Sequence, residues 1–379
     1  MATLTGMHYP TPGTEQDSLR MNEPTMSLTD RAMRWFLESG IQQPSGGVAR
    51  YYHAGTRQFH AVSTEITGYA AATLVYLHRL TGDAGCLEAA VRAGRFLTRV
   101  AWDPSLGTIP YECRPENDSR RPPAYFFDAG IIARGLLALS RITGDQEFLA
   151  TAAACGRSMA QDFRGPSGYH AILSLPDKQP LAGDGRWSRG PGCYQLKSAM
   201  SWLEFGEERY TCLYESVLAG ALRTHSSFLE AEPDRERVMD RLHAYCYFLE
   251  GLLPRATRSD CAPVLGAGIA RAGELLREIA PTFERSDVYA QLLRLRIYAD
   301  ALRVAPLDAG LAEEEAAKLR AFQFGDPDPR LHGAIAFGRR ASERAPFANP
   351  VSTAFALQAL EMWQRHQQSA FRADTLDLI

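Results

Sequence analysis

The sequence lacks the features of membrane, secreted and nucleic-acid-binding proteins. Its longest apolar runs are about a dozen residues and are interrupted by Arg, Gly or Thr, so no transmembrane helix is expected. Its first residues do not place a basic stretch before an apolar one, so no secretory signal is expected. With 41 Lys and Arg against 44 Asp and Glu, the chain has no excess of positive charge for a nucleic-acid partner. We therefore expect a cytoplasmic protein without membrane insertion.

Metal and cofactor motifs are also missing. The 7 cysteines form no C-x-x-C pair, and the 9 histidines show neither H-x-x-x-H nor H-E-x-x-H spacing, so we expect no metal site. No Gly-rich phosphate loop and no G-x-S-x-G elbow is present, so we expect no cofactor. The cysteines are odd in number and scattered, which is typical of reduced thiols in a cytoplasmic protein.

An internal repeat is the strongest positive signal. Residues 66–95 align with residues 128–157 at an offset of 62 positions, and a second step of 62 reaches Gly192 and Phe205-Gly206-Glu207. The matched positions of the first step are Gly68 with Gly130, Leu74 with Leu136, Leu77 with Leu139, Arg79 with Arg141, Thr81-Gly82-Asp83 with Thr143-Gly144-Asp145, and Gly94-Arg95 with Gly156-Arg157. A period of this length is typical of a helical hairpin with a long connection to the next one.

The Thr-Gly-Asp triplets predict tight turns inside each hairpin. The glycine can adopt a positive φ at the end of the first helix, and the aspartate can cap the second. Helical periodicity predicts twelve segments, which would form six hairpins closed into an all-α (α/α)6 toroid over residues 28–379, after a flexible arm over residues 1–27. The segments are 29–39, 66–80, 84–101, 129–142, 146–162, 193–204, 207–229, 234–252, 264–280, 285–303, 312–321 and 351–367.

The connections between hairpins are long, and in a toroid they all fall at one end. They cover residues 40–65, 103–128, 163–192 and 322–350. Long ordered loops are usually functional, so we place the site at this end. The loops combine carboxylates and histidines, which move protons, with arginines and aromatic rings, which bind carboxylates and stack on sugars.

This composition favours an acidic sugar as the substrate. We expect catalytic roles for Asp128, Glu65, His170 and Tyr111, and substrate-binding roles for Trp187, Arg189, Tyr52, His53, Tyr194 and Arg339. Each assignment has a simpler alternative. Asp128 could be only an N-cap, and Glu65 only a first-turn charge behind a Ser63 or Thr64 cap. His170 and His53 could be solvated loop residues, and Trp187 could be a loop anchor.

A resemblance to known families rests on four stretches. GRWSRGPGCYQLKSAMSWLEF (185–205) resembles the W-x-R-G-x-G-W/Y stretch of unsaturated glucuronyl and rhamnogalacturonyl hydrolases, with Cys193 in place of the usual aromatic residue. STEITGY (63–69), the segment 125–145 and NPVSTAFALQALEMW (349–363) are similar to α/α-toroid proteins of bacterial polysaccharide loci, near the N-acylglucosamine 2-epimerases. The resemblance implies a toroid with Asp128 as proton donor and with Trp187 and Arg189 in the pocket. The paired histidines of the epimerases are not evident.

The sequence thus favours a glycoside hydrolase for a uronate-containing oligosaccharide, with Asp128 as acid/base and Glu65 as its partner. A uronyl epimerase or polysaccharide lyase is the second hypothesis, with Tyr111 or His170 removing the proton next to the carboxylate. The third is a non-catalytic toroid that binds glycan or a partner protein in polysaccharide biosynthesis. A homodimer is compatible with the sequence.

Overall fold

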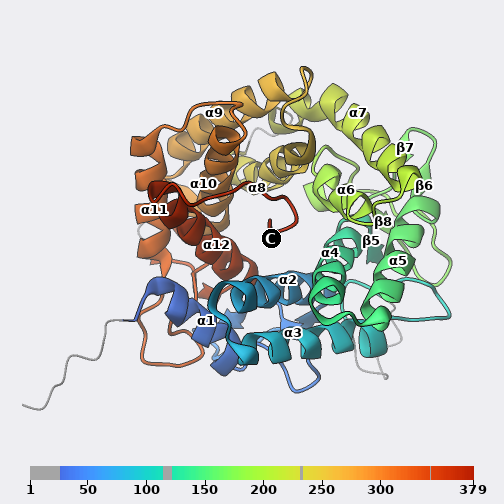
Figure 1. The fold of residues 1–379 in the computed structure, drawn as a ribbon, viewed down its shortest axis with the longest axis horizontal. Coiled ribbons are helices and arrows are strands. Elements are labelled where there is room, and N and C mark those ends of the chain that lie inside the picture. The colour runs from blue at the N-terminus through green and yellow to red at the C-terminus, as the bar shows by residue number, and fades with distance from the viewer. Residues whose placement is uncertain (1–25, 114–121, 231–233, 342) are drawn as a thin grey trace, which may run out of the picture.

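Two concentric layers of helices form a closed ring in the computed structural model, which describes residues 26–113, 122–230, 234–341 and 343–379 (Figure 1). Each inner helix packs against the next, and α12 packs against α2 to close the ring. The inner helices are α2 (Thr64–Thr81), α4 (Phe126–Thr143), α6 (Gln195–Leu203), α8 (Arg235–Leu252), α10 (Ser286–Ala301) and α12 (Pro350–Gln367). The outer helices are α1 (Leu28–Glu38), α3 (Ala84–Phe96), α5 (Gln146–Gln161), α7 (Glu208–Glu230), α9 (Ala262–Ile279) and α11 (Ala309–Phe322).

The predicted (α/α)6 toroid is confirmed, and all twelve predicted segments correspond to these helices. The α1 helix packs beside α12, as expected for the first and last elements of a closed ring. Most of the predicted N-terminal arm, residues 1–25, lies outside the described part of the chain, whereas Ser27 caps α1 through Asp30. No helix among the described residues is long and apolar enough to span a membrane.

The tight turns of the repeat adopt the predicted conformations. Gly82 and Gly144 have φ values of 75° and 72°, and Gly206, at the third turn, has 71°. Asp83 accepts a hydrogen bond from the Cys86 backbone N–H and so caps α3, while Asp145 caps α5 in the same way. These turns lie together at one end of the ring, which we call the turn end.

The repeated glycines of the inner helices allow close packing between helices. A Cβ atom on Gly68 would lie 2.9 Å from the Ile132 Cα of α4, and one on Gly130 would lie 2.5 Å from the Ser198 backbone oxygen of α6. Real Cβ atoms do not approach so closely, so a side chain at either position would force the inner helices apart. The repeat is therefore a packing signal as well as a turn signal.

Short antiparallel strands occupy the opposite end, which we call the loop end. Three sheets have two strands each: β1 (Val48–Ala49) with β4 (Val62–Ser63), β5 (Ala124–Tyr125) with β8 (Ile172–Leu173), and β6 (Arg164–Gly165) with β7 (Gly168–Tyr169). Two sheets have three strands each. In one, β2 (Tyr52–His53) lies between β3 (Gln58–Phe59) and β12 (Phe347–Ala348), and in the other, β10 (Gly338–Arg340) lies between β9 (Phe283–Arg285) and β11 (Glu343–Arg344). The strands β4, β5 and β9 run directly into α2, α4 and α10, and β12 ends one residue before Asn349, which caps α12. These strands therefore fix where the first turns of four inner helices begin.

Candidate active site

Two carboxyl groups stand on the first turns of neighbouring inner helices at the loop end. Glu65 is the second residue of α2, and the Ser63 side chain caps that helix. Asp128 is the third residue of α4, which begins after Tyr125, so Asp128 is not the N-cap. Both side chains keep some solvent-accessible surface, although protein surrounds them.

The two carboxyl groups influence each other's protonation. Burial raises the pKa of Glu65 to about 7, and the charge of Arg50 opposes this rise. Burial, and then the charge of Glu65, raise the pKa of Asp128 well above its usual value. The pair therefore holds a proton at neutral pH, because two adjacent carboxylates in a low-dielectric site do not both ionise readily.

Arg50 and two tyrosines line one side of this carboxyl pair. The Arg50 guanidinium lies 5.5 Å from the centre of the Tyr111 ring, and that ring meets Tyr125 edge to face at 5.7 Å. The backbone N–H of Thr64 donates to the Tyr111 carbonyl at 3.2 Å, which fixes Tyr111 beside the first turn of α2. The structure thus places Tyr111 next to Glu65, as expected for a site residue.

A short 3-10 turn, Trp187–Arg189, covers another side of the site. The Tyr194 hydroxyl donates to the Gly190 carbonyl at 2.9 Å, and Trp187 packs edge to face on the Tyr194 ring at 5.0 Å. The charge of Asp128 contributes, after burial, to raising the pKa of Tyr194, which places this turn close to the carboxyl pair. Because Tyr194 is 1% exposed, it holds the turn in place instead of offering a surface to a ligand.

Arg189 offers an unused hydrogen-bond donor. Its Nη1 pairs with Asp184 at 3.0 Å, but its buried Nε has no hydrogen-bond partner. A buried N–H of a guanidinium is costly to leave unpaired, so this position favours an anionic or carbonyl oxygen from a ligand.

Two predicted binding residues of the first long loop have structural partners instead. Tyr52 is fully buried, and its hydroxyl donates to Asp328 at 3.2 Å, so it presents no ring face to a sugar. Because β2 turns this side chain inward, its contacts give the predicted binding role no support. The His53 Nδ1 accepts the Thr56 backbone N–H at 3.1 Å and so stabilises the β2–β3 turn.

The structure also does not bring His170 and Arg339 to the carboxyl pair. The His170 ring lies over Gly165 in the β6–β7 hairpin, where a Cβ atom would meet its Nε2 at 2.8 Å. Arg339 lies on β10, pairs with Glu284 at 3.4 Å and covers the Phe322 ring at 5.3 Å. Their roles at the site stay predictions, and their contacts give those roles no support.

The structure adds one residue that the sequence analysis did not single out, His243 on α8. Its Nδ1 lies 2.8 Å from the Gln291 Oε1 and 3.5 Å from the nearer Asp287 oxygen. Burial lowers the pKa of His243 to about 4 in spite of the Asp287 charge, so the ring is neutral at pH 7. Its spacing of four residues from Tyr247, in a segment otherwise dominated by apolar residues, is the only sequence signal that could have indicated it.

Aromatic rings from several inner helices connect these groups. Tyr247 meets the rings of His243 at 4.4 Å and Phe127 at 4.7 Å, and Phe355 of α12 meets Tyr69 at 5.4 Å. The charge of Glu65 contributes, after burial, to raising the pKa of Tyr247, so these rings lie near the carboxyl pair. We call Tyr69, Phe127, Tyr247 and Phe355 the aromatic floor, because they separate the carboxyl pair from the charged groups at the ring centre.

Two cavities lie beside the loop-end groups. One of about 290 Å³ is lined by Trp187 and Arg241, and one of about 850 Å³ runs along α7 past Tyr169 and Arg241. Neither of them is lined by Glu65 or Asp128, so the partly exposed carboxyl groups lie outside both. Among the described residues, no three His, Cys, Asp or Glu side chains are grouped in a way that could hold a metal ion.

Comparisons with known proteins identify the architecture but no family. No protein-family model and no curated protein matches the sequence. A cellobiose 2-epimerase from Spirochaeta thermophila DSM 6192 is similar in structure, with a TM-score of 0.68 and 15% identity over 89% of this chain and 95% of that chain. A sugar epimerase from a ruminal bacterium gives a TM-score of 0.66 and 13% identity over 88% and 96%.

A D-mannose isomerase is similar to the same degree, with a TM-score of 0.66 and 11% identity over 89% of this chain and 97% of that chain. At these identities the likeness shows a shared fold, and residue roles must come from the site itself. The chain therefore has the α/α-toroid fold that these sugar-converting proteins also have.

Proposed function

We propose that the protein is a glycoside hydrolase that acts on a uronate-containing oligosaccharide. The observation that carries this proposal is the pairing of Glu65 and Asp128 on adjacent helix starts, with raised pKa values and retained solvent access. Glycoside hydrolysis needs one protonated and one ionised carboxyl group across the scissile bond. A carboxyl pair that keeps one proton near neutral pH meets that requirement, and we assign the proton to Asp128.

The two groups take different steps of the reaction. Asp128 donates its proton to the glycosidic oxygen as the bond from that oxygen to the sugar carbon breaks. Glu65 removes a proton from the water that attacks the same carbon, so the proton count balances at the end of the cycle. Arg50 stabilises the ionised form of Glu65, since its charge lowers the pKa of both carboxyl groups.

The 187–189 turn supports a uronate as the sugar next to the scissile bond. Arg189 has an unpaired buried Nε that can donate to a carboxylate, and Trp187 offers a half-buried ring for stacking on the sugar. We propose that the carboxylate of the sugar accepts a hydrogen bond from the Nε of Arg189. The seven free cysteines, five of them buried, fit a cytoplasmic location, where thiols remain reduced.

The test is hydrolysis of a panel of oligosaccharides with and without a terminal uronate, measured by the release of reducing sugar. The native chain should cleave the uronate-bearing members, and Asp128→Asn and Glu65→Gln should remove turnover. Glu208→Gln is the matched control, because Glu208 is an exposed first-turn glutamate on the outer helix α7. Binding without turnover in the native chain would contradict the proposal and favour a non-catalytic glycan-binding toroid.

Epimerisation is a second candidate because of His243. A neutral imidazole whose Nδ1 is held by Gln291 can remove a proton from a sugar carbon through its Nε2. The similar structures of two epimerases and a mannose isomerase agree with such chemistry. Incorporation of deuterium from heavy water into a recovered sugar, abolished by His243→Gln, would support epimerisation over hydrolysis.

A further inference from the structure

The last described residues of the sequence, 374–379, lie across the ring axis at the turn end (Figure 1). Ring side chains bind this segment mainly through its backbone carbonyl oxygens. The Tyr298 hydroxyl donates to the carbonyl of Asp374 at 2.6 Å, and Arg134 Nη2 donates to that of Thr375 at 2.9 Å. Contacts to carbonyl groups depend on the path of the peptide more than on its side chains.

The end of the segment is held most closely. Lys197 Nζ and Arg294 Nη1 donate to the Ile379 carbonyl at 3.0 and 3.1 Å. Gln358 accepts the Ile379 N–H through Oε1 at 3.1 Å and donates through Nε2 to the Asp377 carbonyl at 2.6 Å. The side chains of Leu378 and Ile379 are 2% and 3% exposed, so two apolar residues are anchored inside the ring.

The groups that hold Ile379 belong to a charged cluster built by the inner helices. Glu250 of α8 pairs with Lys197 of α6 at 3.0 Å and with Arg294 of α10. Arg79 on α2, Arg134 on α4 and Gln358 on α12 contact the segment. All six inner helices therefore contribute either to the cluster or to the contacts with the segment. Burial lowers the pKa of Lys197 to about 7, and the charge of Glu250 opposes this shift. Lys197 and Arg294 share one carboxylate, so both keep N–H donors for a carbonyl ligand.

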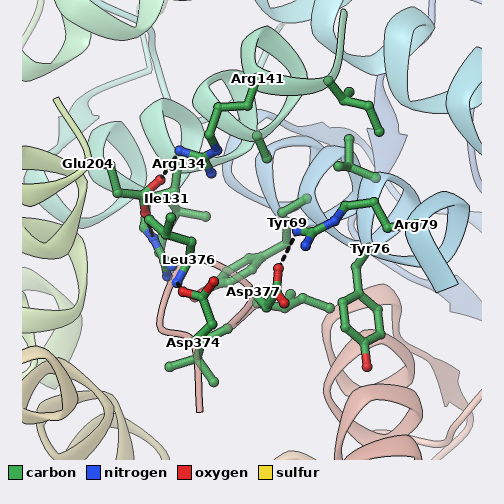
Figure 2. Close-up of a pocket in the computed structure, with 17 residues that line it drawn as sticks. Tyr69, Tyr76, Arg79, Ile131, Arg134, Arg141, Glu204, Asp374, Leu376 and Asp377 are labelled. Atoms are coloured by element: carbon green, nitrogen blue, oxygen red, sulfur yellow. Dashed lines mark hydrogen bonds and ion pairs between the residues drawn. The ribbon is translucent and has the colours of Figure 1, made fainter. Parts of the chain in front are cut away.

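The segment does not fill the opening in which it lies. A cavity of about 380 Å³ remains between it and the helices α2 and α4, with Arg79 and Arg141 on its rim (Figure 2). Asp374 and Leu376 are exposed there, and Asp377 forms an ion pair with Arg79 that is itself partly exposed. The segment is thus anchored by the buried side chains of Leu378 and Ile379, whereas the cavity leaves open space beside residues 374–377.

We propose that the turn end of the ring is a peptide-binding site and that residues 374–379 are its replaceable ligand. The ring binds an extended backbone that ends in two apolar residues, and in this structure its own chain supplies that peptide. Because the contacts are directional hydrogen bonds around one buried anchor, the segment can leave and return while the twelve helices stay folded.

Hydrogen exchange of the full-length chain tests this directly. The amides of residues 376–379 should exchange through a local opening that occurs at least about 100-fold more often than the opening of the inner helices. Exchange of these amides only together with α10 and α12 would overturn the proposal, because the segment would then be an inseparable part of the core.

Binding in trans gives the second test. A chain truncated after Ala373, with its helix content checked by circular dichroism, should bind a fluorescent peptide of residues 368–379 and melt at a higher temperature when the peptide is present. The full-length chain should bind the same peptide about 100-fold more weakly, since its own segment competes at an effective concentration in the millimolar range.

The control peptide carries Leu378→Asp, which places a charge in the apolar anchor and should abolish binding. Equal affinity of the truncated and full-length chains for the native peptide would overturn the proposal, as would a folded truncated chain that does not bind it. If the truncated chain does not fold, the hydrogen-exchange result decides. All these readouts are independent of hydrolysis, so they hold whether or not the proposed enzymatic activity is found.

Discussion

At the loop end of the ring, Glu65 and Asp128 bring two carboxyl groups together, with Arg50 as their positive neighbour. Near the ring centre, by contrast, Lys197 and Arg294 both pair with Glu250, and both donate hydrogen bonds to the Ile379 carbonyl. The same inner helices build both arrangements. Paired and hydrogen-bonded charges are what a stable interior requires, whereas adjacent carboxyl groups cost stability and indicate a chemical role.

The largest effect should follow from breaking the loop-end pair. Asp128→Asn should lower kcat/KM for the substrate found in the panel by about 10²- to 10⁴-fold, the usual contribution of a general acid. The melting temperature should stay the same or rise, because folding at neutral pH shifts Asp128 towards its protonated form, and this cost is absent for an asparagine. A loss of activity together with a loss of stability would instead indicate a structural role for Asp128.

Breaking the charged cluster at the ring centre should lower the stability of the protein, in contrast to breaking the loop-end pair. Lys197→Met leaves Glu250 with one partner and removes a donor to Ile379, so we expect a loss of about 3–5 kcal/mol in the free energy of unfolding, typical of a broken buried ion pair. Arg320→Met is the control, because its ion pair with Glu313 is half-exposed and should contribute no more than about 1 kcal/mol. Chemical denaturation of both variants measures the difference.

Removing the stacking surface should have a smaller effect. Trp187→Ala should raise KM about tenfold and leave kcat within a factor of about three, since the ring binds substrate and does not take part in proton transfer. Steady-state kinetics at saturating and limiting substrate separates the two constants. A fall in kcat with an unchanged KM would show that Trp187 acts on the reaction itself.

The most gradual effect concerns pH. Glu65 ionises near pH 7 in the folded chain and near 4.5 when unfolded, so the folded state keeps a proton that the unfolded state has lost. Stability should therefore fall by about 2–3 kcal/mol as pH rises from 4.5 to 7, while activity rises as Glu65 ionises. Thermal unfolding across this range measures the slope. Glu65→Gln should reduce the slope, and Asp128, whose pKa is also raised, accounts for the remainder.

The fold was predictable because its signals are local and repeated. The Thr-Gly-Asp turns at Gly82 and Gly144 and the glycines at helix crossings recur at one offset, so they indicated hairpins without any long-range information. The positions of Glu65 and Asp128 were predictable for the same reason, since Glu65 directly precedes one copy of the repeat and Asp128 is the first residue of the other. Their positions at equivalent helix starts follow from the sequence alone.

The other site residues depend on contacts between distant segments. His243 is distinguished by Gln291 and Asp287 of another helix, and no local pattern gives that pairing. The burial of Tyr52 was not predictable, because its strand pairs with β12, nearly three hundred positions away in the sequence. The polar sequence around Asp374 gave no sign that Leu378 and Ile379 lie inside the ring.

In the reaction we propose, residues 374–379 would also affect how a long substrate approaches. While they lie across the axis, held by Lys197 and Arg294, they would keep a polymer from passing through the ring. A sugar chain that entered from the loop end would meet the aromatic floor, so its terminal units would reach Glu65 and Asp128. The enzyme we propose would therefore shorten chains from one end. The length of each released product would depend on how far the first sugar enters before it contacts the aromatic floor.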